Sequence, residues 1–146
     1  MKEIETLARQ TVERYGTASP FALCERMDIP VVCLELPKRT QGFCFQNGAR
    51  PVIVLDLELT GRQRDYCCAH ELGHVLLHPG LNEQAAADLT NLCTCRYERE
   101  ADYFAACLLI DPNLREWNRT YQPLTVELIA SLSGLPERIV GLRFGQ

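Results

Sequence analysis

The sequence His70-Glu71-Leu72-Gly73-His74 constrains the fold of this 146-residue chain more than any other stretch, because its side chains can act together only on an α-helix. Residues four apart on a helix share a face and lie about 6 Å apart along the axis. His70 and His74 can therefore bind one metal ion, while Glu71 can reach a water on that metal without ligating it. Zinc-dependent hydrolysis requires this division of roles. The alternative is a surface helix whose histidines only form caps and pairs.

The residues around this motif predict a helix from about 61 to 78. Thr60 is suited to be its N-cap, and Gln63 three residues later would complete a capping box. Apolar or small residues recur with helical spacing, and Pro79-Gly80 ends the pattern. This context favours the metal-site interpretation.

A second amphipathic helix downstream offers a third metal ligand. Apolar residues have helical spacing across 97–110, and Pro112 ends the pattern. Glu98 and Asp102 share one face, which suits a glutamate ligand and an aspartate that accepts the free N–H of a ligating histidine. Glu100 points about 200° away from Glu98 and is the reserve ligand. Without the histidines, these glutamates would be ordinary carboxylates of a first helical turn.

The third histidine of the chain, His78, does not fit the same ion. It lies about 12 Å along the helix axis from His70, which is too far to share one metal. A metzincin would place its third histidine two residues later. We therefore interpret His78 as a cation near a helix C-terminus.

Two stretches, residues 64–78 and 98–106, resemble the ImmA/IrrE family of metallo-endopeptidases. The family pattern over these residues is F-x-x-A-H-E-L-G-H followed by E-x-x-A-N/D-x-F-A-A. This chain departs from it at Tyr66-Cys67-Cys68, where F-T-L is commoner, with apolar or small replacements that leave the chemistry intact.

The resemblance implies a gluzincin-like site in which His70, His74 and Glu98 bind zinc and Glu71 is the catalytic base. It also implies a protein substrate, since members of the family are regulators that cleave a phage or mobile-element repressor or control a DNA-damage response. The residue that stabilises the oxyanion stays open among four tyrosines: Tyr66, Tyr97, Tyr103 and Tyr121.

The rest of the chain predicts an α+β fold, a minimal zincin-like domain spanning residues 1–146. Further helices are predicted at residues 4–15 and from Ser19-Pro20 onward, and strands at 31–36, 42–46 and 51–55. The last two strands would form a hairpin around Asn47-Gly48. We expect a small antiparallel sheet beside the motif helix, with a free edge strand that binds an extended peptide. Residues 79–96 would form a long connection.

Composition and hydropathy bear on localisation and partners. A net charge of −4 and a pI near 5.4 argue against general binding to nucleic acid, which would need a basic face. No apolar stretch approaches about 18 residues, and the N-terminus lacks a signal-like apolar region. We therefore expect a cytoplasmic protein with no membrane partner and no direct nucleic-acid partner. The eight cysteines fit reduced core thiols, and Cys93-Thr94-Cys95 in a loop leaves metal or redox sensing open.

The C-terminal residues suggest a different function, DNA binding. Residues 124–136 resemble the first helix and turn of a helix-turn-helix, but 136–143 supply barely two turns and two arginines for a recognition helix. A helical hairpin that packs on the enzyme or docks a partner is the simpler interpretation. Two alternatives to a peptidase therefore stay open: a metal-binding derepressor that acts by protein contact, and a DNA-binding switch that uses the tail.

Overall fold

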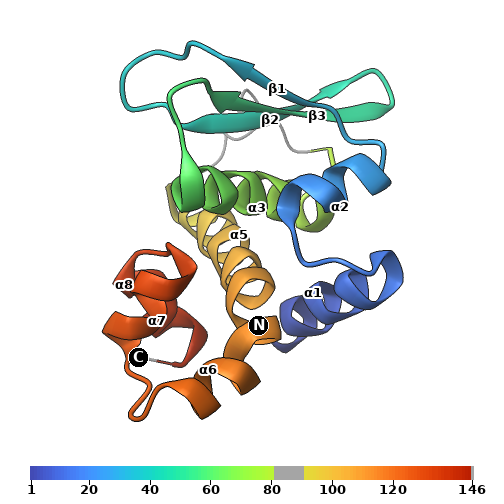
Figure 1. Cartoon of the computed structure of the whole chain (residues 1–146). Helices are drawn as coiled ribbons and strands as arrows, with labels where there is room; N and C mark the ends of the chain where they lie inside the picture. Colours follow the sequence, from blue (N-terminus) through green and yellow to red (C-terminus); the bar gives the residue numbers. More distant parts are fainter. Residues whose placement is uncertain (81–90, 146) are drawn as a thin grey trace.

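Three strands form a sheet against one side of a group of helices in the computed structural model, which describes residues 1–80 and 91–145 (Figure 1). The helices are α1 (Lys2–Tyr15), α2 (Pro20–Arg26), α3 (Gly61–Leu77), α5 (Asn91–Ile110), α6 (Leu114–Thr120), α7 (Val126–Ser133) and α8 (Glu137–Arg143), with a 3-10 turn η1 (Asp111–Asn113). The strands are β1 (Val31–Leu34), β2 (Gly42–Asn47) and β3 (Arg50–Asp56). The predicted α+β class is confirmed.

Helix α1 ends at Gly16 and α2 starts after Ser19, as the sequence predicts, although α1 begins two residues before the predicted stretch. Gly16 caps α1 with a φ of 69°, a left-handed conformation that glycine adopts without a steric penalty. The hydroxyl of Ser19 accepts a hydrogen bond from the backbone N–H of Ala22, 3.3 Å away, and Pro20 occupies the first turn of α2.

The sheet has the strand order β1-β3-β2. Strands β2 and β3 form the predicted antiparallel hairpin, closed by Gly48-Ala49 between the paired residues Asn47 and Arg50. The expectation of a wholly antiparallel sheet is wrong, because β1 pairs with β3 in parallel, with Val31 opposite Ile53. The chain crosses from β1 to the opposite edge, where β2 runs the other way, and the hairpin then reverses it again.

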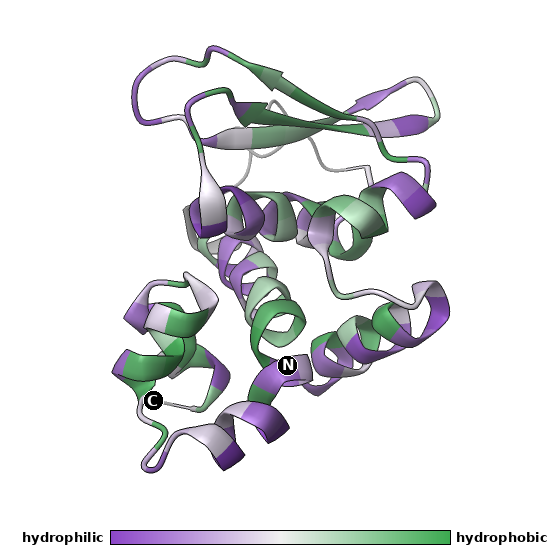
Figure 2. Cartoon of the chain, in the orientation of Figure 1, coloured by the Kyte–Doolittle hydropathy of each residue, from purple (hydrophilic) through white to green (hydrophobic). Residues whose placement is uncertain are grey.

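Helix α3 lies beneath the sheet and spans the predicted residues. Thr60 is its N-cap, but the Thr60 side chain makes no capping hydrogen bond, so the expected capping box does not form. Cys68 and Leu72 on α3 share the main core with Ile53 and Leu55 on β3. Strands β1 and β3 are hydrophobic along most of their length (Figure 2). Burial of the β3 side chains in the core that they share with α3 holds this helix against the sheet.

Helix α5 is shared between two hydrophobic clusters. Phe104 and Leu108 belong to the main core, whereas Ala106 and Ile110 belong to a second cluster with α7 and α8. The helix begins at Asn91, so Cys93 and Cys95 are helical and the loop predicted for them is wrong. The rest of the connection predicted at 79–96 lies partly outside the described residues.

The C-terminal helices are fastened to α3 by Arg62. Its Nη1 donates hydrogen bonds to the backbone carbonyls of Ser131, at 2.6 Å, and Leu132 at the end of α7. Gly134 then caps α7 with a φ of 80°, and a Cβ at this position would collide with Arg62. The tail is therefore packed as a helical hairpin on the rest of the chain.

Four of the described cysteines, Cys24, Cys67, Cys68 and Cys107, are buried free thiols. Burial raises the pKa of Cys67 to about 11 and that of Cys107 to about 12, which keeps both protonated near neutral pH. No helix in the described part of the chain is long and apolar enough to cross a membrane.

Candidate metal centre

A close approach of α5 to α3 sets the geometry of the site. A Cβ at Gly73 would lie 3.2 Å from the Cα and carbonyl oxygen of Ala101 and from Cδ1 of Phe104. Carbon atoms normally stay about 3.5–4.0 Å apart. The glycine of the motif therefore lets α5 approach far enough for Glu98, one turn earlier on that helix, to contact the face of α3 that carries both histidines.

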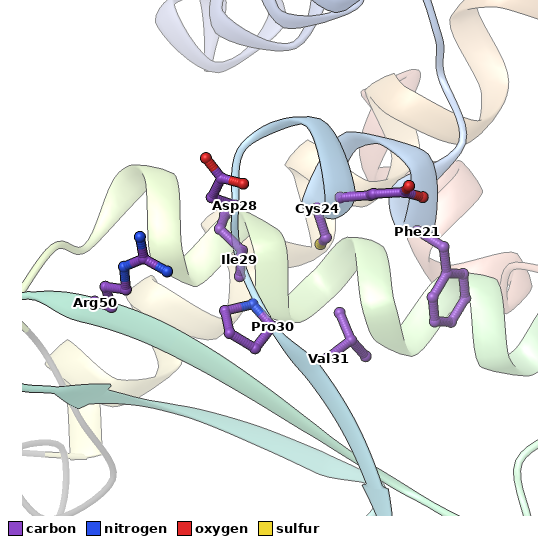
Figure 3. A pocket seen from close by; sticks show the side chains of 8 residues that line it. Phe21, Cys24, Asp28, Ile29, Pro30, Val31 and Arg50 are labelled. Atoms are coloured by element: carbon purple, nitrogen blue, oxygen red, sulfur yellow. The ribbon is translucent and has the colours of Figure 1, made fainter.

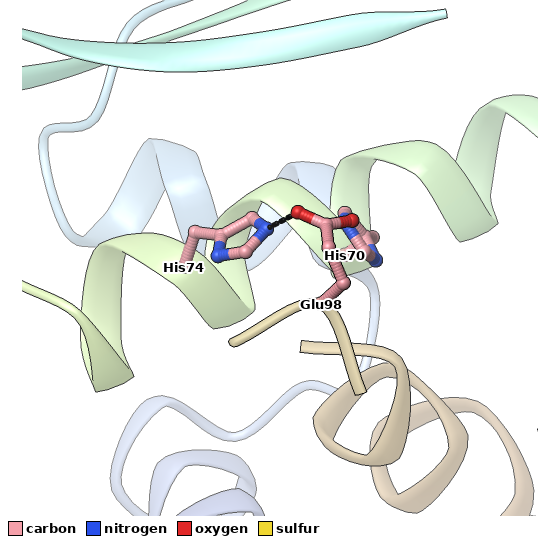
Figure 4. A group of neighbouring side chains, drawn as sticks. All are labelled: His70, His74 and Glu98. Carbon is pink, nitrogen blue, oxygen red and sulfur yellow. Dashed lines mark hydrogen bonds and ion pairs between the residues drawn. The ribbon is translucent and has the colours of Figure 1, made fainter. Parts of the chain in front are cut away.

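Glu98 contacts both histidines of the motif through one carboxylate. Its Oε1 lies 2.9 Å from Nε2 of His74, and its Oε2 lies 3.0 Å from Nε2 of His70 (Figure 4). One ligand atom from each of the three residues lies within 4.8 Å of the others. Two imidazole nitrogens and a carboxylate oxygen form a donor set found in zinc hydrolases, so these residues fit a zinc ion.

The outer nitrogen of His70 is held by Asp102. Its Nδ1 lies 2.8 Å from Oδ1 of Asp102, the residue predicted for this position. The hydroxyl of Tyr66 donates to the same oxygen at 2.7 Å, and Nη1 of Arg138 is 3.5 Å from Oδ2. A carboxylate that accepts the Nδ1–H leaves the Nε2 lone pair free for a metal.

The outer nitrogen of His74 faces His78. The two Nδ1 atoms are 3.0 Å apart, and Nε2 of His78 lies 2.9 Å from Oε1 of Glu100. His78 follows the last residue of α3, as predicted, but its side chain is only 5% exposed, and burial lowers its pKa. The expectation of a cation at the helix end is therefore wrong. Glu100, the reserve ligand, contacts His78 and not the metal-facing nitrogens.

Glu71 lies in a hollow of about 220 Å³ beside His70 and Glu98. Its carboxylate is buried, and this burial raises its pKa. The N-terminal end of β2 closes one side: a Cβ at Gly42 would be 3.7 Å from Cγ of Glu71 and 2.9 Å from the carbonyl oxygen of Val54. The start of strand β2 therefore lies beside the predicted base, with the tighter contacts at Gly42 made to β3.

Hydrogen bonds between the histidines and the carboxylates shift the pKa values of both kinds of group. Burial by itself lowers the pKa of His70, but its hydrogen bonds with Asp102 and Glu98 outweigh this effect and raise the pKa to about 10. Hydrogen bonds with His70 and His74 hold the pKa of Glu98 well below its usual range. The carboxylate of Glu98 is therefore ionised where the ligand atoms converge, which suits a cation.

Two arginines at this hollow, Arg39 and Arg138, were not predicted as site residues. Arg138 comes from α8, and from the sequence we considered it only as one of the two arginines available to a recognition helix. Of the four tyrosines, Tyr66 lines the hollow, whereas the hydroxyl of Tyr103 donates to Glu5 on α1. No local pattern marks these arginines, since each reaches the site through the tertiary fold.

A second hollow, of about 480 Å³, lies between α2 and the start of β1 (Figure 3). The residues that line it are Phe21, Cys24, Glu25, Asp28, Ile29, Pro30, Val31 and Arg50. None of them belongs to the group around His70, so this hollow is separate from the candidate metal centre.

A helix with two histidines meets a second helix with a glutamate beneath a small sheet, and this arrangement is that of a minimal zincin-like domain. The chain belongs to the peptidase family M78, because the model of its IrrE N-terminal-like domain matches residues 24–143. The resemblance to the ImmA/IrrE family is thereby confirmed.

Two relatives extend the similarity over nearly the whole chain. One is "Uncharacterized immunity region protein 2" of Bacillus phage phi105, 29% identical over 141 residues, which cover 96% of this chain and 88% of that protein. The other is "Metallopeptidase ImmA" of Bacillus subtilis (strain 168), 23% identical over 146 residues, which cover 99% of this chain and 86% of that protein.

Proposed function

We propose that this chain is a zinc-dependent endopeptidase that cleaves a specific regulatory protein, such as a phage or mobile-element repressor. The observation that carries the proposal is the single carboxylate of Glu98 at 2.9 and 3.0 Å from the Nε2 atoms of His74 and His70, with Glu71 beside them. Membership of a peptidase family and the similarity to a phage immunity region protein support it.

His70, His74 and Glu98 would hold the zinc ion. Zinc in such a site acts as a Lewis acid that polarises a carbonyl group and lowers the pKa of a coordinated water. Asp102 would orient His70 through its Nδ1–H, 2.8 Å away.

Glu71 is the proposed general base. Its buried carboxylate has a raised pKa, which brings its proton affinity closer to that needed at neutral pH. It would accept a proton from the attacking water and later give this proton to the nitrogen of the leaving amine. The hollow of about 220 Å³ that Glu71 lines has room for the reacting peptide group.

The substrate would bind as an extended strand along β2. Among the described strands, β2 pairs with β3 alone, which leaves its other edge for a peptide. Its end at Gly42 lies against Glu71, so a peptide paired with β2 would pass the proposed base. Phe45 is an exposed aromatic side chain on this strand.

We further propose that the C-terminal hairpin is part of one peptidase domain that spans residues 1–146. Arg143 is engaged with Asp111 at 3.0 Å, and Arg138 faces Asp102 in the hollow at 3.5 Å. Arg143 is one of the two arginines that a recognition helix would use, and its side chain is only 18% exposed, so its engagement weighs against a DNA-binding switch. A gel shift at moderate salt that shows tight, sequence-dependent binding would overturn this choice.

Incubation of the zinc-loaded protein with a co-encoded repressor tests the function. The wild type and the control Glu127→Gln, an exposed change on α7, should clip the repressor at one site. Glu71→Gln should retain zinc and lose at least about 100-fold in rate. Full activity of Glu71→Gln would refute the assigned base. Binding without cleavage by the wild type would favour the derepressor instead.

A further inference from the structure

The two histidines of the proposed metal site are supported by different partners. His70 meets a carboxylate directly, since Asp102 Oδ1 is 2.8 Å from its Nδ1. His74 meets a second histidine: its Nδ1 is 3.0 Å from Nδ1 of His78, whose Nε2 is 2.9 Å from Oε1 of Glu100. A chain of carboxylate, imidazole and imidazole therefore ends at the metal-facing nitrogen of His74.

The geometry permits one arrangement of protons when His74 binds a metal through Nε2. A neutral imidazole that ligates through Nε2 carries its proton on Nδ1. That proton must then be donated to the bare Nδ1 of His78. His78 in turn carries its own proton on Nε2 and donates it to Glu100, which as a carboxylate only accepts. Each ring nitrogen of His74 and His78 then has a partner, and so does Oε1 of Glu100.

The environment of His78 holds this chain in place. The ring is 5% exposed, and the ring of Tyr97 packs edge-on against it with centroids 4.4 Å apart. Nε of Arg96 lies 3.7 Å from the other oxygen of Glu100. Because the His78 ring contacts Tyr97, His74 and Glu100, it has little freedom to turn its Nδ1 away from His74.

We propose that His78 and Glu100 are positioning residues that hold His74 in the tautomer and orientation that bind the metal. The inference rests on the proposed function, because it assumes a metal on His70, His74 and Glu98. Without an acceptor at position 78, His74 is free to carry its proton on Nε2 and donate it to Glu98. Metal binding must then reverse this tautomer, so affinity falls. Loss of a comparable partner typically costs 10–100-fold in metal affinity.

Two substitutions separate positioning from packing. His78→Phe keeps a ring of similar size but has no acceptor. His78→Asn places an amide oxygen where Nδ1 stands, so it retains the acceptor while losing the ring. Glu100→Gln keeps an acceptor without charge, and the exposed Glu116→Gln is the control for loss of one negative charge.

The measurements are the zinc dissociation constant, by competition with a chromophoric chelator, the visible spectrum of the Co²⁺-loaded protein, and thermal unfolding of the metal-free protein. We expect His78→Phe to bind zinc about 10–100-fold more weakly and to alter the Co²⁺ bands. We expect His78→Asn to recover most of the affinity even if its metal-free form unfolds at lower temperature. Glu100→Gln should fall between the wild type and His78→Phe, and Glu116→Gln should match the wild type.

Each outcome decides between positioning and packing. If affinity follows the stability of the metal-free forms, so that the Asn variant is weaker than the Phe variant, the role of His78 is packing and the proposal is refuted. If His78→Phe binds zinc as tightly as the wild type, the inference fails while the proposed function stands. If the wild type itself binds no zinc, both fail.

Discussion

Replacing Gly73 by alanine tests whether the spacing between α3 and α5 builds the metal site. Helix propensity alone predicts that this change stabilises the chain by about 1 kcal/mol. The added Cβ, however, would meet the backbone of Ala101 and the ring of Phe104 at 3.2 Å, and both residues are fully buried. Overpacking of this kind typically costs about 1–3 kcal/mol. The two effects together give a net destabilisation of about 0–2 kcal/mol.

The effect on zinc should exceed the effect on stability. Relief of the contacts at position 73 moves the two helices apart by a few tenths of an ångström, and Glu98 moves with α5. Zinc–ligand distances tolerate about 0.2 Å, so we expect weaker zinc binding by about tenfold, the loss that a small ligand misplacement produces. Urea unfolding of the metal-free protein and chelator competition measure the two quantities. A Gly73→Ala variant that is about 1 kcal/mol more stable and binds zinc normally would refute the reasoning.

Three further predictions concern stability and metal content. Burial and a hydrogen bond to Glu5 raise the pKa of Tyr103 to about 12. Because this folded value lies above the unfolded value of about 10, the phenol's contribution to stability is complete below pH 10 and is lost as pH rises through 12. The difference between wild type and Tyr103→Phe in urea unfolding should therefore shrink over this interval, and a constant difference would contradict the assignment. Arg62→Ala loses the hydrogen bonds to two carbonyls at the end of α7. The free energy of unfolding should fall by about 1 kcal/mol, seen as a lower melting temperature. An unchanged melting temperature would show that the hairpin docks without Arg62. Glu98→Ala should lose bound zinc in equilibrium dialysis while Glu127→Ala retains it, and unchanged stoichiometry would move the third ligand elsewhere.

Local signals made the motif helix predictable. Helical spacing of apolar residues and a proline-glycine stop are properties of adjacent residues, and α3 accordingly spans Gly61–Leu77. The hairpin of β2 and β3 was predictable for the same reason, since its turn residues follow one another in the chain. The partnership of Glu98 with the histidines came from the spacing within α5 and from the family resemblance together.

Features that depend on distant parts of the chain were not predictable. The parallel pairing of β1 with β3 depends on where the crossover leads, which no short pattern encodes. His78 was interpreted as a helix-end cation because its partner Glu100 lies 22 residues away on another helix. Arg138 reaches the site only because α8 packs against α5. In each case tertiary contact decided the role of the residue.

The most direct test of the account is the location of zinc in crystals of the wild-type protein. Anomalous diffraction on the two sides of the zinc absorption edge identifies both the metal and its position. The account predicts one peak about 2.0–2.2 Å from Nε2 of His70, Nε2 of His74 and a carboxylate oxygen of Glu98. A peak on other residues, such as Cys95 or His78, or no peak between α3 and α5 in zinc-soaked crystals, would contradict it.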